Sequence, residues 1–233
     1  MLRVGLTGGL GSGKSTAMKF FAANGAYVFF ADEIGRALMQ PGEDVYAAIV
    51  AQFGNAVVRA DGSLDRPALA RLAFEGGRLE ELEAIVHPAT IARQAEMIEE
   101  VAARDANAVT IVESALIFQT KYGPGQTKYD GEETKDGGEG GWAKRFDRII
   151  FVQASEELKI ARFVARSSGA RTPDAEQRTA LEAEARRRLA QQAESERNAE
   201  RCDYVLANDG SPDQLRAQVD VLWLELKELA RCG

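Results

Sequence analysis

The sequence contains few of the residues that build disulfide networks or zinc sites. Among its 233 residues are two cysteines, Cys202 and Cys232, and one histidine, His87. These are too few for a disulfide framework and for a four-ligand zinc site made of histidine and cysteine. We therefore interpret both cysteines as structural or incidental.

Long apolar runs are also absent. No stretch reaches the roughly eighteen apolar residues of a membrane-spanning helix, and Met1–Gly5 leads into a glycine-rich loop instead of a signal-peptide core. We expect a cytoplasmic protein with no membrane partner. The net charge of −7 argues against general nucleic-acid binding, so a phosphate-binding site must be built locally.

Hydrophobic residues make up 45% of the chain, enough to bury a full core. Five short apolar segments predict strands: Leu2–Thr7, Ala26–Phe30, Ala108–Val112, Arg148–Val152 and Tyr204–Ala207. Helical patterns alternate with them: Lys14–Ala23, Ser155–Arg166, Asp174–Arg201 and a last helix with a capping box at Ser211 and Gln214. Nearly continuous apolar strands indicate a sheet covered on both faces. The prediction is an α/β fold with a parallel sheet.

Two segments interrupt this alternation. From Asp32 to Arg104 the pattern is helical, with breaks predicted at Pro41-Gly42, Asp61-Gly62, Gly76-Gly77 and Pro88. We expect a helical lobe there, suited to holding an acceptor. The stretch from Gln119 to Lys144 is glycine-rich and too polar for a core, which predicts a mobile surface loop.

The strongest motif lies between the first predicted strand and the first predicted helix. Gly8-Gly9-Leu10-Gly11-Ser12-Gly13-Lys14-Ser15 fits the phosphate-loop pattern G-x-x-x-x-G-K-[ST] completely. The glycines let backbone N–H groups turn toward phosphate oxygens, and the following helix adds its positive end. Lys14 is expected to reach the β- and γ-phosphates, Ser15 to bind Mg²⁺, and Thr16 to extend the site toward the α-phosphate. The predicted ATP-binding residues of the loop are Gly9, Gly11, Ser12, Gly13, Lys14, Ser15 and Thr16.

The loop does not by itself identify the acceptor of the phosphate. The guanine-specific pattern N-K-x-D is absent, and the third predicted strand ends in Glu113-Ser114 where a motor or switch ATPase usually has Asp-Glu. A kinase is therefore favoured, and it needs a group that orients the acceptor hydroxyl.

Further motifs, in order, resemble the dephospho-coenzyme A kinase family over nearly the whole chain. The phosphate loop reads Gly5-Leu-Thr-Gly-Gly-Leu-Gly-Ser-Gly-Lys-Ser-Thr16, and Asp32 falls on the aspartate that follows the family's second strand. The other matching segments are Phe53-Gly54, Asp61 to Arg66, His87-Pro88, Leu116-Ile117-Phe118, Arg162 with Arg166, Ala185 to Arg188 with Gln192, and Asp203 to Gly210. The sequence departs from the family at Phe30, Ala115 and Gln119, where an acidic residue, a proline and a glutamate are common.

The resemblance implies a three-layer α/β/α P-loop NTPase fold in a single domain, with a helical acceptor-binding lobe and a lid. The expected boundaries are about 1–34, 106–154 and 202–233 for the core, about 35–105 for the lobe and about 155–201 for the lid. The implied partners are ATP and dephospho-coenzyme A, with Mg²⁺ as cofactor. ATP would phosphorylate the ribose 3′-hydroxyl of dephospho-coenzyme A to give coenzyme A, the last step of its biosynthesis. A monomer or a small homo-oligomer is expected.

Asp32 and Lys14 are the predicted catalytic residues. Asp32 is expected to hydrogen-bond the acceptor hydroxyl and take its proton late, and the alternative is that it only caps a helix. Glu113 is expected to hold Mg²⁺ with Ser15, and the alternative is an ordinary carboxylate at a strand end. Arg162 and Arg166 share a helix face and are predicted, with Arg188, to close over the triphosphate; the alternative is a solvated charged face.

Three residues receive binding roles chiefly from the resemblance. His87 and Phe118 are predicted to contact the acceptor, although a lone histidine is often only a packed residue. Asn208 lies where similar kinases contact the adenine, and the alternative is a turn residue beside Asp209-Gly210. The competing functions are a nucleoside monophosphate kinase and a non-catalytic nucleotide-dependent binding protein.

Overall fold

The computed structural model describes residues 1–118, 144–169, 171–191 and 197–232. The chain divides into two compact units. The sheet unit contains Met1–Val28, Arg104–Phe118 and Phe146–Gly233, and the helical unit contains Phe29–Ala103 and Gln119–Arg145. The predicted loop at 119–144 lies outside the described residues, except for Lys144. The family departure Gln119 and the family match Gln192 also lie outside them.

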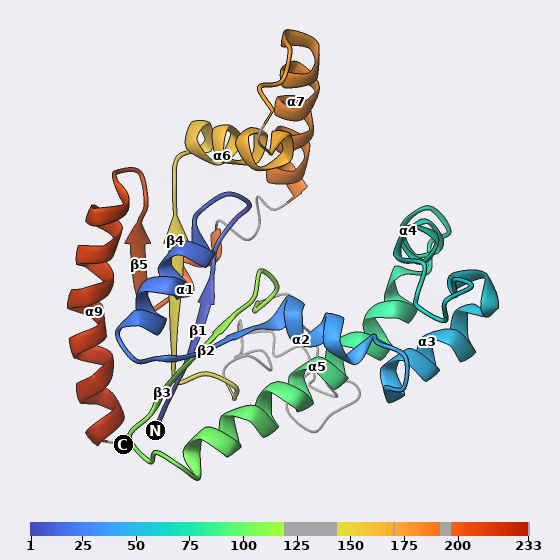
Figure 1. The fold of residues 1–233 in the computed structure, drawn as a ribbon. Helices are drawn as coiled ribbons and strands as arrows, with labels where there is room; N and C mark the ends of the chain where they lie inside the picture. The colour runs from blue at the N-terminus through green and yellow to red at the C-terminus, as the bar shows by residue number, and fades with distance from the viewer. Residues whose placement is uncertain (119–143, 170, 192–196, 233) are drawn as a thin grey trace, which may run out of the picture. The chain divides into compact units, whose positions relative to one another are not determined.

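A five-stranded sheet carries the sheet unit (Figure 1). Its strands stand in the order β2-β3-β1-β4-β5, and the pairs β1–β3, β1–β4 and β4–β5 are parallel. The predicted α/β fold with a parallel sheet is confirmed. The strand bounds are β1 (Leu2–Thr7), β2 (Tyr27–Phe30), β3 (Val109–Glu113), β4 (Arg148–Gln153) and β5 (Tyr204–Ala207).

Two helices of the sheet unit pack against each other and against its strands, α1 (Lys14–Ala23) and α9 (Pro212–Cys232). The start of α9 has the predicted capping box, because Ser211 N donates to Gln214 Oε1 at 2.9 Å and Gln214 N donates to Ser211 Oγ at 3.3 Å. The apolar stripe of this helix is buried at Leu215, Val219, Leu222 and Leu226. The capping box was predicted from the sequence and is confirmed.

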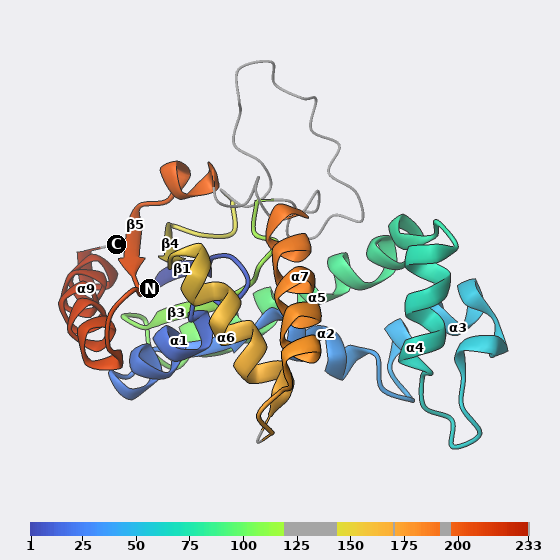
Figure 2. The ribbon, with the colours of Figure 1, turned by 90° about the horizontal axis from the view of Figure 1, so that it is seen from above.

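Helices α6 (Glu156–Ser168) and α7 (Ala175–Gln191) lie side by side (Figure 2). Their shared core consists of Ile160, Phe163, Val164 and Ala185, with Leu10 of the phosphate loop packed against it. The prediction of one helix from Asp174 to Arg201 is wrong at its end, since Asn198–Arg201 forms a 3₁₀ turn.

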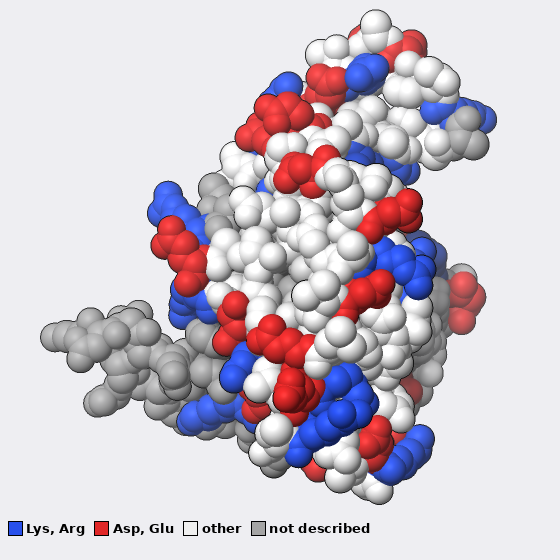
Figure 3. All heavy atoms as spheres, turned by 90° about the vertical axis from the view of Figure 1, so that its left-hand side faces the viewer, with Lys and Arg blue, Asp and Glu red and all other residues white. Residues whose placement is uncertain are grey.

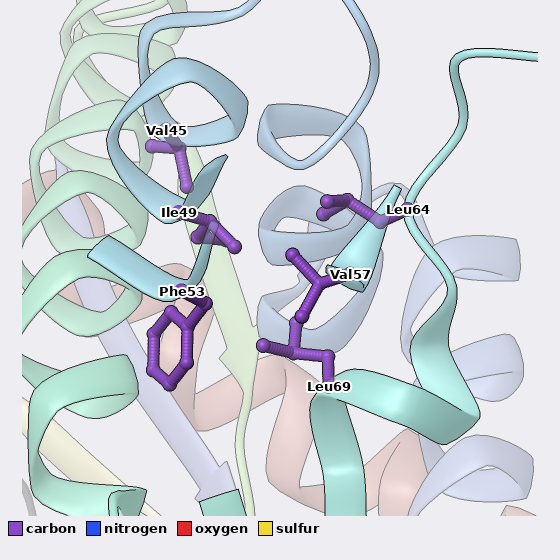
Figure 4. Packing of buried hydrophobic residues seen from close by; sticks show 6 residues of the cluster. All are labelled: Val45, Ile49, Phe53, Val57, Leu64 and Leu69. Atoms are coloured by element: carbon purple, nitrogen blue, oxygen red, sulfur yellow. The ribbon is translucent and has the colours of Figure 1, made fainter. Parts of the chain in front are cut away.

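The helical unit has its own small core (Figure 4). Its elements are α2 (Ala31–Leu38), α3 (Asp44–Phe53), the 3₁₀ turn η1 (Asn55–Val57), α4 (Arg66–Ala70), the π-helical turn η2 (Arg71–Glu75) and α5 (Leu79–Ala102). The core residues are Val45, Ile49, Phe53, Val57, Leu64 and Leu69. Within residues 31–103, the only extended pairing is an isolated antiparallel bridge between Val58 and Leu64, as the helical prediction requires.

The predicted break at Pro88 is wrong, because Pro88 lies inside α5, an unbroken helix of 24 residues. A proline inside a helix removes one backbone hydrogen bond and costs about 3 kcal/mol. The residues after it compensate, since Thr90, Ile91 and Gln94 are buried on this helix. Tertiary packing therefore outweighs the local signal of the proline.

The face shown in Figure 3 carries lysine and arginine side chains interspersed with aspartate and glutamate side chains. In the part of the chain that the structure describes, no helix has the length and apolar character needed to cross a membrane.

Candidate nucleotide and acceptor site

The phosphate loop connects β1 to α1, as its motif predicts. Gly13 is the N-cap of α1 and has a φ of 99°, a left-handed conformation that favours glycine. The ammonium of Lys14 donates to the carbonyl oxygens of Gly8 at 2.8 Å and Gly9 at 3.2 Å. Its side chain is therefore folded back along the loop.

The carboxylate of Glu113 lies close to the same lysine. Glu113 ends β3, where its Cα pairs with that of Leu6 on β1, and its Oε1 is 3.8 Å from Lys14 Nζ. Ser15, in the first turn of α1, is exposed. A hydroxyl and a carboxylate at the carboxyl edge of the sheet are the oxygen ligands that Mg²⁺ prefers, so these residue types fit the predicted ion. Within the described residues, no group of three or more His, Cys, Asp or Glu is arranged to hold a metal by itself.

Ser12 lies inside the loop, and its side chain is fully buried. Its Oγ has no hydrogen-bond partner among the described residues. A Cβ added at Gly8 would come within 2.9 Å of this oxygen, which shows how closely the loop wraps around it. A buried hydroxyl without a partner is costly in a folded protein, and a ligand oxygen is one group that can satisfy it.

Arg162 and Asn208 contact each other and the backbone of the loop. The guanidinium of Arg162 donates to Gly11 O at 3.3 Å, to Ser12 O at 3.5 Å and to Asn208 O at 2.9 Å. The amide nitrogen Nδ2 of Asn208 donates to Ser12 O at 2.7 Å. The structure thus brings both residues to the loop backbone. Their predicted contacts with the triphosphate and the adenine stay predictions.

Lys159 was not singled out from the sequence, yet its backbone touches the loop. A Cβ added at Gly11 would lie 2.6 Å from Lys159 O and 3.0 Å from its Cα, so α6 packs directly on this glycine. Lys159 as a whole is 5% exposed. A contact between backbones more than a hundred residues apart leaves no local pattern in a single sequence.

Arg166 and Arg188, the other two predicted lid arginines, both lie near the ring of Phe163. The Arg166 guanidinium carbon is 6.0 Å from the ring centroid and that of Arg188 is 5.4 Å away. Arg188 also donates from Nε to Glu184 Oε1 at 2.7 Å, the surface ion pair that its spacing indicates. These two arginines therefore lie together, while Arg162 faces the phosphate loop.

Asp32 belongs to the helical unit, where it lies exposed in the first turn of α2 directly after β2. The N-cap of this helix is Phe30, and no side chain caps it. The alternative interpretation of Asp32 as an N-cap is therefore wrong. A carboxylate in the first turn of a helix remains favourably placed for the helix dipole, and here it is also open to a ligand.

His87 lies half-buried on α5 in the helical unit, beside a polar group that sequence reasoning missed. Arg145 is 8% exposed and donates from Nη2 to Oε1 of the buried Gln94 at 2.8 Å. Burial lowers the pKa of His87; Arg145 lowers it further, and Glu83 opposes the shift. Burial likewise lowers the pKa of Arg145 to about 10. The histidine is thus biased toward its neutral form.

Phe118 is part of the sheet unit, at the end of its second segment. The Arg201 guanidinium carbon lies 5.1 Å from its ring centroid. Its predicted contact with the acceptor stays a prediction, as does that of His87.

Comparison with known proteins identifies the family. The family model described as dephospho-CoA kinase matches residues 2–125. A dephospho-CoA kinase of Mycolicibacterium paratuberculosis is 37% identical over 97% of this chain and 47% of that protein, so the chain spans about half of its length. One from Symbiobacterium thermophilum is 36% identical over 99% of this chain and 81% of the relative.

A solved structure agrees in fold. The crystal structure of TT1252 from Thermus thermophilus has a TM-score of 0.69 and 28% identity, covering 97% of each chain. Together with the phosphate loop and the sheet order, these similarities show that the chain belongs to the dephospho-CoA kinase family, whose members phosphorylate dephospho-CoA with ATP in the last step of CoA biosynthesis.

Proposed function

We propose that this chain transfers the γ-phosphoryl group of ATP to the ribose 3′-hydroxyl of dephospho-CoA. The observation that carries the proposal is the phosphate loop between β1 and α1, with Lys14 and the Glu113 carboxylate 3.8 Å apart at its edge. Phosphoryl transfer depends mainly on positioning and charge neutralisation, which a loop of backbone N–H groups and a lysine supply.

We assign binding of the β- and γ-phosphates to the loop and to Lys14. The ammonium already lies within hydrogen-bond distance of Gly8 O and Gly9 O, and a rotation of this long side chain aims it at a phosphate oxygen. Ser15 and Glu113 would hold Mg²⁺, which neutralises phosphate charge when it is bound.

Asp32 is the proposed group that orients the acceptor hydroxyl and receives its proton. A carboxylate suffices for this step, because the transition state is loose and the proton leaves late. Its exposure in the first turn of α2 supports the proposal, because the group is not engaged in capping the helix. His87 and Phe118 are proposed to contact the acceptor, and Arg162, Arg166 and Arg188 to serve the nucleotide.

From the sequence we also propose that the chain divides into a core, an acceptor lobe at about 35–105 and a lid at about 155–201. The proposed location is the cytoplasm, and the proposed state is a monomer or a small homo-oligomer with no nucleic-acid or membrane partner.

The test is a coupled ADP-release assay with purified protein, ATP and Mg²⁺. Dephospho-CoA is compared with adenosine, AMP, CMP and no acceptor. We expect turnover with dephospho-CoA alone, and a product that carries the new phosphate on the 3′-oxygen by phosphorus NMR. Turnover with AMP or CMP instead would keep the kinase and refute the acceptor. No turnover with any of them would favour a nucleotide-dependent binding protein.

A further inference from the structure

We propose that Asn208 is a positioning residue that holds the phosphate loop in its binding shape, with Arg162 as its support, and that it does not read the adenine. The inference rests on the proposed function only in that the loop binds a nucleotide triphosphate. It follows from three sets of contacts within the sheet unit.

The first set fixes Asn208 itself. Its backbone N donates to Gln153 O at the end of β4 at 2.8 Å, and its backbone O accepts from Arg162 Nη2 at 2.9 Å. The side chain then donates from Nδ2 to Ser12 O at 2.7 Å. Asn208 is thus held from β4 and from α6 while its side chain holds the loop.

The second set concerns the peptide between Ser12 and Gly13. Its carbonyl oxygen accepts from both Asn208 Nδ2 and Arg162 Nη1, at 2.7 and 3.5 Å. The bond is trans, so its N–H points opposite to its C=O. The two donors therefore fix the Gly13 N–H on the side of this peptide that faces away from them, where a phosphate oxygen can accept from it.

The third set is steric. A Cβ added at Gly13 would lie 1.9 Å from Asn208 Nδ2, so glycine at this position is required by the contact as well as by its φ of 99°. Asn208 is 6% exposed. A side chain so enclosed, with one of its two amide hydrogens donated to Ser12 O, has little surface left for a base.

The experiment compares wild type with Asn208→Ala, using calorimetry in the presence of Mg²⁺ and no acceptor. The ligands are ATP, GTP and inorganic tripolyphosphate. Loss of a hydrogen bond that organises the loop should weaken ATP and tripolyphosphate by the same factor, about tenfold. The ratio of the GTP and ATP dissociation constants should stay at its wild-type value, since the base is not involved.

A matched control is Gln218→Ala. Gln218 exchanges hydrogen bonds with the backbone of Ala207, at 3.0 Å and 2.7 Å, so it anchors the residue next to Asn208 without touching the loop. We expect its nucleotide affinities to equal those of wild type. Equal losses in both variants would mean that Asn208 only stabilises the β5 end, and would overturn the proposal.

The proposal is also overturned if Asn208→Ala leaves the affinity for ATP unchanged. It is likewise overturned if ATP binds more weakly while tripolyphosphate does not, or if the ratio of the GTP and ATP dissociation constants changes. Thermal melts verify that the variants fold. Should Asn208→Ala not fold, Asn208→Ser, whose hydroxyl is too short to reach Ser12 O, is measured in its place. Because no acceptor is present, a wrong assignment of the acceptor leaves this test intact.

Discussion

Arg188 of α7 lies over the ring of Phe163 of α6, with 5.4 Å between the guanidinium carbon and the ring centroid. Arg166, on the same helix as the phenylalanine, approaches the same ring at 6.0 Å. One buried aromatic side chain thus gathers two cations from two helices of the sheet unit. A cation over a ring retains its charge, so both arginines can still attract phosphate oxygens.

Replacing Arg166 and Arg188 together by alanine should raise the KM for ATP by about tenfold, as expected for the loss of charge-assisted contacts to phosphate. The KM for dephospho-CoA should change little. Arg178→Ala is the control, because Arg178 is an exposed arginine of α7 paired with Glu182 at 3.1 Å. Unchanged turnover and ATP affinity in the double variant would refute the lid assignment.

Asp32→Asn should lower kcat by about 10²- to 10⁴-fold, the usual contribution of a group that accepts a proton. ATP affinity, measured by calorimetry without acceptor, should be unchanged, because the phosphate loop is intact. Glu33→Gln serves as control, since Glu33 is the neighbouring exposed carboxylate in the first turn of α2. A variant that turns over at the wild-type rate would remove Asp32 from the mechanism.

Asp147→Asn should destabilise the sheet unit by about 1 kcal/mol at neutral pH, a modest value because the pair with Arg3 is partly solvated. Arg3 donates to this carboxylate from its backbone N at 2.8 Å and from Nη2 at 2.7 Å. Burial raises the pKa of Asp147, but the hydrogen bonds and charge of Arg3 outweigh it, so the pKa is lowered overall.

The pKa of Asp147 is lower in the folded protein than in the unfolded chain. The charged carboxylate therefore stabilises the fold fully at pH values above the unfolded pKa, and this stabilisation is lost as the pH falls through the folded pKa. The difference in urea stability between wild type and Asp147→Asn should therefore shrink below about pH 4. A difference that is constant down to acid pH would show that the aspartate acts only through its shape.

The two cysteines should differ in reactivity. Burial raises the pKa of the Cys202 thiol to about 12, with a further contribution from Asp203, whereas Cys232 is exposed. Only the thiolate reacts, so iodoacetamide at pH 8 should label Cys232 first and Cys202 only slowly. Peptide mass spectrometry reads the two sites separately. In Cys232→Ser, fast labelling of Cys202 in the folded protein would contradict this prediction.

Local sequence patterns predicted the bounds of helices and strands well where turn-forming residues mark the ends of an element. The strands Leu2–Thr7 and Tyr204–Ala207 and the helix Lys14–Ala23 have the predicted bounds, because turn glycines and capping residues mark their ends. Pro88 misled the prediction, since proline weighs against a helix locally while the buried residues that follow it favour one.

Much of the candidate site depends on contacts that a local pattern does not carry. The loop motif identifies Lys14 and Ser15, but the hydrogen bond from Asn208 to Ser12 joins residues 196 positions apart. The buried pair of Arg145 and Gln94 and the packing of Lys159 on Gly11 were missed for the same reason. Each is decided by the three-dimensional arrangement of elements that are far apart in the sequence.

The central position of β1 has a consequence for how the protein is made. Its partners are β3 at Val109–Glu113 and β4 at Arg148–Gln153, so both neighbours leave the ribosome long after β1 itself. The hydrogen bond from Asn208 to the Ser12 carbonyl of the phosphate loop forms only when Asn208 has been synthesised. The phosphate loop is thus translated long before the residue that holds its Ser12 carbonyl, and this contact is missing from every nascent chain that ends before Asn208.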